Sequence, residues 1–356
     1  MTYIAPKAKV LAHIDRLVDW RRGLKPAPVT VEWDLSNRCV LGCQDCHFAH
    51  THVKGPWAVK PRTLPMAFSS TGDTADVTVV VTALREMAEA GVKAIVWSGG
   101  GEPTTHGRWQ EIVAAAAGYG LEQGMYTCGG LLTEASARFE SEHLTWVVVS
   151  LDCKDAETYA AEKGVPAARF DDACNGARWL SGGKAAVGVS FLLHGDNWTH
   201  AQEMVLLARR LGATYTTFRP AIHAYPDLPS RCADYRGWIT AALPALERIS
   251  WAVDVEIDLN RFRQYLEWNG HGYSDCKGVQ LNATVTPDGR VWLCPQRRGI
   301  EGSCVGDLSR ESFAAVWARH PGHYHVDEGC RVMCRLHPVN QQIAALDVTP
   351  VHGAFV

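Results

Sequence analysis

The sequence predicts an α/β fold in which a partial, TIM-like (β/α)6 barrel is followed by a small domain built around a β-hairpin. Three observations support this expectation. Between residues 29 and 259, short apolar runs alternate with segments of helical periodicity, which is typical of parallel strands joined by helices. Beyond residue 259, short strands flank the turn 286–289 (TPDG), which favours a hairpin. The length of 356 residues fits about two domains.

The first predicted elements lie on either side of a cysteine-rich loop. Residues 1–28 are expected to form an N-terminal helical extension, and residues 29–35 alternate apolar and polar side chains as a strand does. Residues 47–76 show little periodicity and many Gly, Pro, Ser and Thr residues, so we expect a long loop that can act as a lid. Apolar spacing then predicts a helix over 77–87 and a buried strand over 94–97.

The remaining barrel elements repeat this alternation. We expect further strands over 124–128, 145–151, 185–193, 214–219 and 253–259. We expect further helices over 133–141, 156–163, 199–210 and 235–249. Together these elements make about six βα units in a barrel domain of residues 29–259. Residues 260–356 are expected to form the second domain and the C-terminal tail, with hairpin strands over 279–285 and 290–293.

Composition places the chain among ordinary globular proteins. The 35 Lys and Arg residues nearly balance the 38 Asp and Glu residues, so no global field attracts nucleic acid or an anionic membrane; a local basic patch would leave nucleic acid open as a partner. The sequence has no signal-peptide core and no run of about 18 apolar residues, so we expect a cytoplasmic protein without a membrane partner. Its twelve cysteines favour metal or redox chemistry, because a reducing cytosol does not keep structural disulfides.

Three of these cysteines lie on the loop that follows the first predicted strand. Cys39, Cys43 and Cys46 can converge on one metal centre, and thiolates are the ligands of iron-sulfur clusters. Three thiolates on a four-iron cluster would leave one iron without a protein ligand. A zinc site with His47 as its fourth ligand and chance clustering are the alternatives, although structural zinc sites favour paired Cys-x2-Cys units.

A second motif follows the next predicted strand. Residues 97–103 read Trp-Ser-Gly-Gly-Gly-Glu-Pro, and glycines let a backbone approach a ligand closely. Together with the cysteine motif, this segment resembles the radical S-adenosylmethionine (radical SAM) enzymes. The resemblance implies a [4Fe-4S] cluster on the three cysteines and S-adenosyl-L-methionine bound through Gly100, Gly101 and Glu102. It also implies electron transfer from the cluster, which releases a 5′-deoxyadenosyl radical that abstracts a substrate hydrogen.

The same resemblance implies cofactor contacts at later strand ends. Ser150 and Asp152 belong to a Ser-Leu-Asp segment similar to that of the family, and Ser190 lies on the following strand. Lys163 stands near where the family often has an arginine. The alternatives are a lysine on a helix surface and a serine that fills space in the barrel. One departure is Asp45, because the family usually has an aromatic residue there that packs near the adenine.

Two cysteines near the predicted cofactor site have a possible catalytic role. Residues 126–130 (YTCGG) resemble a strand end of the family, with Cys128 in place of asparagine. A thiol in that position can donate a hydrogen atom to a product radical, and the same role is open to Cys153. The alternative for both residues is a small buried side chain without reactivity, which is common for a free cysteine.

Arg219 is the candidate for substrate binding. It lies at the end of a central predicted strand, where the register directs it toward the mouth of the barrel. A guanidinium there suits a carboxylate or a phosphate. The alternative is an internal ion pair with Asp258 or Glu32. The pair Arg297-Arg298 is too short to indicate phosphate binding on its own.

The last quarter of the chain carries a second cysteine set. Cys276, Cys294, Cys330 and Cys334, with the hairpin between them, resemble the twitch form of the SPASM auxiliary-cluster domain. The resemblance implies a second [4Fe-4S] cluster in which four thiolates satisfy four irons. Cys304 can replace one ligand, because spacing alone does not decide connectivity. Zinc on the same thiolates is the alternative.

The function expected from these features is that of a radical SAM oxidoreductase or isomerase. Its substrate would be a small amino-acid-like or sugar-like molecule that is oxidised or rearranged. A peptide or protein maturase acting on a separate carrier is an alternative, as is modification, such as isomerisation, of an amino-acid-decorated nucleobase in nucleic acid. A non-enzymatic iron-sulfur scaffold is argued against by the Gly-Gly-Glu motif. The expected partner is an external flavodoxin-like or ferredoxin-like electron donor.

Overall fold

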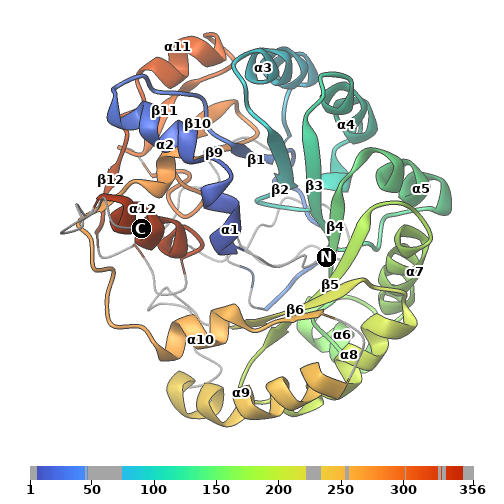
Figure 1. Ribbon diagram of the computed structural model, residues 1–356. Helices are drawn as coiled ribbons and strands as arrows, with labels where there is room; N and C mark the ends of the chain where they lie inside the picture. Colours follow the sequence, from blue (N-terminus) through green and yellow to red (C-terminus); the bar gives the residue numbers. More distant parts are fainter. Residues whose placement is uncertain are drawn as a thin grey trace.

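One curved sheet organises the protein in the computed structural model, which describes residues 6–44, 46, 74–221, 234–252, 256–300, 302–327, 330 and 334–347 (Figure 1). Its strands, in order across the sheet, are β11 (Cys304–Asp307), β10 (Arg290–Trp292), β9 (Asn282–Val285), β1 (Thr30–Asp34), β2 (Ala94–Ser98), β3 (Glu122–Thr127), β4 (Trp146–Ser150), β5 (Ala186–Leu193), β6 (Tyr215–Pro220) and β7 (Glu256–Asp258). Strands β1 to β7 are parallel neighbours in chain order. Their carboxyl ends therefore meet at one edge, where the predicted site residues lie.

Helices connect the parallel strands and cover the outer, convex side of the sheet (Figure 1). They are α3 (Val77–Glu89), α4 (Trp109–Gly118), α5 (Glu134–His143), α6 (Ala156–Lys163), α7 (Arg169–Ser181), α8 (Ala201–Arg210) and α9 (Tyr235–Ala252). The predicted α/β fold class, with a partial barrel of parallel strands, is thus confirmed. Within the described residues the sheet ends at β7 and β11 and does not close.

Helix α3 shows how local sequence produces these elements. The Asp76 carboxylate accepts hydrogen bonds from the backbone N–H groups of Thr78 (2.8 Å) and Val79 (3.1 Å), which caps the first turn. The buried residues of the helix follow one face at helical spacing: Val80, Ala83, Leu84 and Met87. This face packs into the main core, which is centred on residues such as Trp33 and Trp97 that are fully buried.

Two helices of the barrel were not expected from the sequence. Helix α4 buries residues 109, 112, 113 and 116, and α7 buries residues 173, 174, 177 and 180 among others. Both sets have the i, i+3 or i+4, i+7 spacing of an amphipathic helix, so the signal was present. The expected strand over 253–259 is shorter, since β7 begins at Glu256; residues 253–255, like residues 47–73 of the expected loop, lie outside the described part.

The last part of the chain adds its hairpin to the edge of the barrel sheet. Strand β9 pairs in parallel with β1, with Asn282 opposite Thr30, and pairs in antiparallel fashion with β10. The strand expected over 279–285 starts later, because residues 278–280 form a 3-10 turn. Further elements are α10 (Asn260–Leu266), β8 (Asp275–Cys276), α11 (Phe313–Ala318), β12 (Tyr324–His325) and α12 (His337–Asp347).

The two ends of the described chain meet on one side of the molecule. Helix α1 (Pro6–Leu11) contacts α12, and both lie beside the hairpin, away from the outer helices (Figure 1). Helix α2 (Ile14–Arg21) follows and leads to β1. Among the helices of the described residues, none combines the length and apolar character that crossing a membrane requires.

Candidate active site

The loop that carries the first cysteine motif is fastened to the end of α6. Backbone N–H groups of this loop bond to carbonyl groups of the last helical turn, from Gly42 to Lys163 (2.6 Å) and from Gln44 to Glu162 (3.0 Å). The Gln44 side chain adds a bond to the Ala161 carbonyl (2.7 Å). Carbonyl groups at a helix end lack intrahelical partners, so this docking satisfies both segments. Helix α6 thereby fixes the position of the cysteine loop.

The thiols of this loop are close enough to influence one another. Burial raises the pKa of Cys43 to about 11, while the neighbouring Lys163 ammonium acts in the opposite direction. Burial also raises the pKa of Cys39, and the charge of Cys43 raises it further. Such buried thiols favour the neutral form unless a metal takes the place of the protons. Asp45 and the candidate ligand His47 lie outside the described residues.

Gly101 holds the Gly-Gly-Glu segment against the cysteine loop. Its N–H donates to the Ser36 carbonyl (2.9 Å), and the next N–H, of Glu102, donates to the Arg38 carbonyl (2.8 Å). A Cβ atom on Gly101 would overlap the backbone of Arg38 and Asn37. The sequence predicted close approach of this glycine to a ligand. The close approach that the structure shows is to the backbone that leads into Cys39.

Glu102 joins the ends of β2 and β3. Its carboxylate is buried and accepts hydrogen bonds from the Thr127 hydroxyl (2.7 Å), the Cys128 backbone N–H (2.6 Å) and the Thr104 hydroxyl (2.7 Å). Cys128 is therefore positioned directly beside the motif. Burial, followed by the charge of Glu102, raises the pKa of the Cys128 thiol well above its usual range. Cys153 is also buried, and burial raises the pKa of its thiol.

The predicted residues on β4 and β5 form a polar group beside the cysteine loop. Ser150 and Ser190 are register partners on these strands. Asp152 has a left-handed backbone (φ 63°), accepts from the Leu192 N–H (2.8 Å) and pairs with Lys163. Lys163 is buried, so its interpretation as a surface lysine is wrong. Burial alone would lower the pKa of Lys163, but the charges of Asp152 and Cys43 raise it well above its usual value.

The four predicted cysteines of the second set line one cavity. Cys276, Cys294, Cys330 and Cys334 all contribute to its wall, although they come from segments separated by up to 58 residues. Cys304 lies exposed on β11 and does not line the cavity, so it is not placed as a substitute ligand. Burial raises the pKa of Cys276 to about 11, and it also raises the pKa of Cys294 and of Cys330.

Each of these four sulfur atoms accepts a hydrogen bond from a nitrogen donor. Three donors are neutral groups and one is a guanidinium. The bonds run from Asn340 Nδ2 to Cys276 Sγ (3.0 Å), from the Gln296 N–H to Cys294 Sγ (3.4 Å), from the Leu336 N–H to Cys334 Sγ (3.4 Å) and from Arg297 Nη2 to Cys330 Sγ (3.4 Å). Donors of this kind stabilise thiolates that ligate a metal and tune its electronic properties.

The arrangement of the thiols bears on the choice between a cluster and a single metal ion. A zinc ion requires its ligands to converge within about 2.3 Å of one point, whereas a cubane spreads four thiolates over four irons. Within the described part of the chain, no three His, Cys, Asp or Glu side chains converge in a way that could hold a single ion. Four thiolates that line one cavity match the ligand number of either group.

A buried network of ion pairs connects β1 to the segments that carry the second cysteine set. Arg298 pairs with Glu32 (2.9 Å) and with Asp34, and Arg335 pairs with Glu32. Burial raises the pKa of Asp34 to about 6, with Arg298 opposing it. The proposed ion pair between Arg219 and Glu32 is thus wrong, because two other guanidinium groups occupy this carboxylate.

Arg219 instead reaches across the concave side of the sheet to Tyr126. Its Nη2 donates to the Tyr126 hydroxyl (3.2 Å), and its guanidinium carbon lies 5.2 Å from the centre of that ring. Within the described residues no carboxylate lies within 4.0 Å of Arg219, so the alternative pairing with Asp258 is not formed either. The Asp258 carboxylate caps Asn260, from whose N–H it accepts a bond of 2.9 Å.

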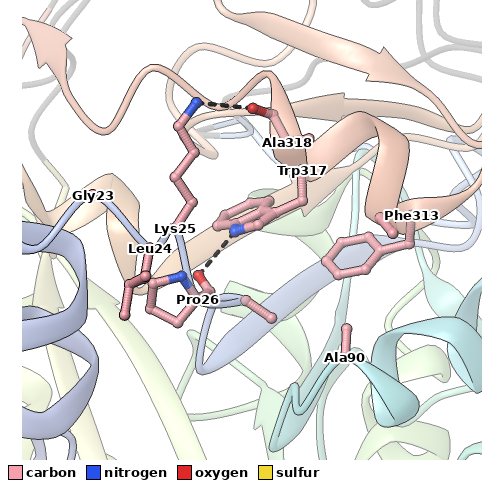
Figure 2. A pocket seen from close by; sticks show the side chains of 10 residues that line it. Gly23, Leu24, Lys25, Pro26, Ala90, Phe313, Trp317 and Ala318 are labelled. Carbon is pink, nitrogen blue, oxygen red and sulfur yellow. Dashed lines mark hydrogen bonds between the residues drawn. The ribbon is translucent and has the colours of Figure 1, made fainter.

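Another pocket lies at the opposite end of the strands (Figure 2). Its wall consists of the segment before β1, the end of α3 and one side of α11. Trp317 Nε1 donates to the Pro26 carbonyl (2.9 Å), and Lys25 Nζ donates to the Ala318 carbonyl (2.8 Å), which tie the two sides together. None of the residues predicted for a site lines this pocket.

Sequence reasoning missed the residues that support the second cysteine set. Arg297 and Arg298 follow Cys294 closely, and Arg335 follows Cys334 directly. Their proximity to these cysteines in the sequence could have marked them as supporting residues. Asn340 lies on α12, and nothing in the sequence connects it with Cys276, which precedes it by 64 residues. Such a contact depends on the packing of α12 against the hairpin region.

Comparison with known proteins identifies a matching family and several similar proteins. The Radical SAM superfamily matches residues 33–208, a range that contains both the cysteine loop and the Gly-Gly-Glu segment. The PqqA peptide cyclase of Methylocella silvestris is 25% identical over 304 residues, covering 83% of this chain and 75% of that protein. The PqqA peptide cyclase of Gluconobacter oxydans is 28% identical, covering 84% and 78%. The mycofactocin maturase MftC of Mycolicibacterium smegmatis is 28% identical, covering 62% and 50%.

Solved structures show the same fold. Streptococcus suis SuiB bound to S-adenosylmethionine superposes with a TM-score of 0.63 at 13% identity, covering 90% of this chain and 72% of SuiB. Native anSMEcpe with bound AdoMet gives a TM-score of 0.61 at 15% identity, covering 82% of this chain and 80% of anSMEcpe. The matched motifs and the match over residues 33–208 lead to one conclusion: this segment of the chain is a Radical SAM superfamily domain.

Proposed function

We propose that this radical SAM enzyme modifies a peptide, using one [4Fe-4S] cluster on Cys39, Cys43 and Cys46 and a second on the four cysteines that line the cavity. The observation that carries the peptide substrate is the likeness, over more than 80% of this chain, to proteins named PqqA peptide cyclases. These relatives do not support the main expectation of a small amino-acid-like or sugar-like substrate. They support the alternative, a maturase that acts on a peptide.

The first cluster and S-adenosylmethionine would lie at the carboxyl ends of β1 to β5. When bound together, they supply a 5′-deoxyadenosyl radical. The protein holds the cysteine loop through α6 and presses the Gly-Gly-Glu backbone against it. Ser150 and Ser190, adjacent at the ends of their strands, would contact the methionine part of the cofactor. Gly100, with Gly101 and Glu102, would complete that side of the site.

Other residues predicted for this site already have partners within the protein. Asp152 and Lys163 pair with each other beside Cys43, so their contribution would be to position the cysteine loop and the strand end. Cys128 remains a candidate hydrogen-atom donor, because its buried thiol lies beside Glu102 and stays protonated at neutral pH. A partner that supplies electrons, either flavodoxin-like or ferredoxin-like, remains a prediction.

The second cluster would be completely held by protein thiolates. The four N–H donors to sulfur and the lining of the cavity support this assignment. A cluster whose four irons all have protein ligands leaves no iron for a cofactor. Its role would therefore be to exchange an electron with the substrate radical or with the external electron donor. Whether the overall reaction is an oxidation or an isomerisation then depends on whether that electron leaves the protein.

The test is anaerobic reconstitution followed by two measurements. Two clusters predict about eight irons per chain, and the reduced enzyme is expected to form 5′-deoxyadenosine from S-adenosylmethionine. Small peptides encoded beside the gene are then incubated with the enzyme and weighed by mass spectrometry. Loss of two hydrogens indicates net oxidation, and a modified peptide of unchanged mass indicates isomerisation. Turnover of a free metabolite with no change in any peptide would refute the peptide substrate.

A further inference from the structure

We propose that Arg219, together with Arg261, binds a carboxylate of the peptide substrate in the space between the two cysteine sites. This inference rests on the proposed function, since it names the chemistry that the peptide must present. The carboxylate can belong to an acidic side chain or to the C-terminus of the peptide. The two sources share the same recognition by guanidinium groups, which match a carboxylate in geometry and charge.

The position of Arg219 follows from its bond to Tyr126. Arg219 lies on β6 and Tyr126 on β3, and two strands, β4 and β5, separate them in the sheet. A bond of 3.2 Å between their side chains must therefore cross the concave side of the curved sheet. Arg219 as a whole residue is partly buried. The ring of Tyr126 supports its guanidinium.

The charge of Arg219 is not neutralised locally. Its bonded partner is a neutral phenol, and in the described part of the chain every carboxylate is more than 4.0 Å away. The negative charge of Asp152 acts on Arg219, but the Asp152 carboxylate already binds Lys163 and the Leu192 N–H. Burial alone would lower the pKa of Arg219, but Tyr126, Asp152 and Asp258 raise it, so the residue stays charged.

Arg261 adds a second positive charge near Arg219. It lies on α10, which packs against β6. Burial lowers the pKa of Arg261 to about 10, and the positive charge of Arg219 contributes to this decrease. Two like charges in a partly buried space repel each other, and an anion placed between them removes that cost. Arg335, another guanidinium of this region, pairs with Glu32.

The same helix locates the proposed site relative to the second cluster. Gln264 of α10 donates to the Cys334 carbonyl (3.3 Å), and its Oε1 accepts a long hydrogen bond from Arg261 (3.4 Å). The charge of Asp152, at the predicted cofactor site, raises the pKa of Arg219. A carboxylate bound here would therefore hold the adjoining part of the peptide between the radical source and the second cluster.

The test uses the reconstituted holoenzyme and three short peptides that differ only in their carboxylates. Ac-Gly-Glu-Gly-NH2 carries a side-chain carboxylate, Ac-Gly-Gln-Gly-OH carries a terminal one, and Ac-Gly-Gln-Gly-NH2 carries none. Affinities are measured by isothermal titration calorimetry. We expect at least one charged peptide to bind at least tenfold more tightly than the neutral peptide, because a charge-assisted bond replaces a neutral one. Whichever charged peptide binds identifies the source of the carboxylate.

Three variants separate this role from effects on folding. Arg219→Gln is expected to bind all three peptides equally, and Arg219→Lys is expected to keep part of the preference because it keeps the charge. Arg138→Gln changes an exposed residue of α5 and should keep the full preference. Equal affinities for the wild type, or no binding of either charged peptide, would overturn the inference. If the enzyme shows no preference for a charged peptide but still forms 5′-deoxyadenosine, only this inference fails. If it forms no 5′-deoxyadenosine, the proposed function itself is refuted.

Discussion

The two cysteine sites are built in different ways. The first set lies within eight residues of one loop, and backbone bonds to α6 and to the Gly-Gly-Glu segment hold that loop in place. The second set is gathered from distant segments, and each sulfur receives its own N–H donor. The first is a local motif fixed by backbone contacts, whereas the second exists only after tertiary packing.

The largest expected effect comes from removing the local motif. The triple variant Cys39→Ala, Cys43→Ala, Cys46→Ala should retain about four of eight irons and lose all 5′-deoxyadenosine formation, because no other cluster has an open iron. Iron analysis and chromatography measure both quantities. Cys174→Ala, which changes a buried cysteine of α7, is the matched control. Cofactor cleavage by the triple variant would show that the first site has been misassigned.

The ligand assignment of the second cysteine set is tested by substituting one buried and one exposed cysteine. Cys294→Ala should remove the electron paramagnetic resonance signal of the second cluster and leave that of the first, since the two sites use separate ligands. Cys304→Ala should keep both signals, because this thiol is exposed and does not line the cavity. The opposite result, in which only Cys304→Ala loses a signal, would mean that Cys304 is the ligand.

Backbone packing in the first site is tested at Gly101. Gly101→Ala introduces a methyl group where the Arg38 backbone lies, so we expect a loss of about 1–3 kcal/mol in stability and weaker binding of S-adenosylmethionine. Gly107→Ala is the control, because open space surrounds that position. Thermal melting and cofactor titration measure the effects. Equal behaviour of the two variants would contradict the proposed contact between the loops.

The smallest effect concerns the ion pairs between the two sites. Because the pKa of Asp34 rises from 3.8 to about 6 on folding, its contribution to stability is complete below pH 3.8 and is lost as the pH rises through 6. Between pH 5.5 and 7.5 the wild type should therefore lose about 1 kcal/mol relative to Asp34→Asn. The lowered pKa of Glu32 adds nothing in this window, because that group is ionised in both states. Denaturant unfolding at the two pH values provides the measurement, and a constant difference would refute the raised pKa.

The sequence was sufficient for the parts of the molecule that depend on local pattern. The strand and helix alternation, the strand-end position of Cys39 and the placement of Gly101 all follow from neighbouring residues. The partners of Arg219 and Arg298 could not be found in this way. Tyr126 reaches Arg219 only across the curved sheet, and Asp34 meets Arg298 only because the hairpin strand β9 pairs with β1. The same holds for Asn340, whose bond to Cys276 depends on how α12 packs.

The parallel pairing of β9 with β1 has a consequence for synthesis on the ribosome. Strand β1 obtains one neighbour, β2, early, but its other neighbour starts at Asn282, roughly 190 residues after Ala94. At about 5–20 residues per second, translation needs about 10–40 s to cover that distance. During this interval the strand that leads to the first cysteine motif has an unpaired edge, which is prone to aggregation. Nascent chains stalled before residue 282 should therefore depend on chaperones more than chains that have emerged completely.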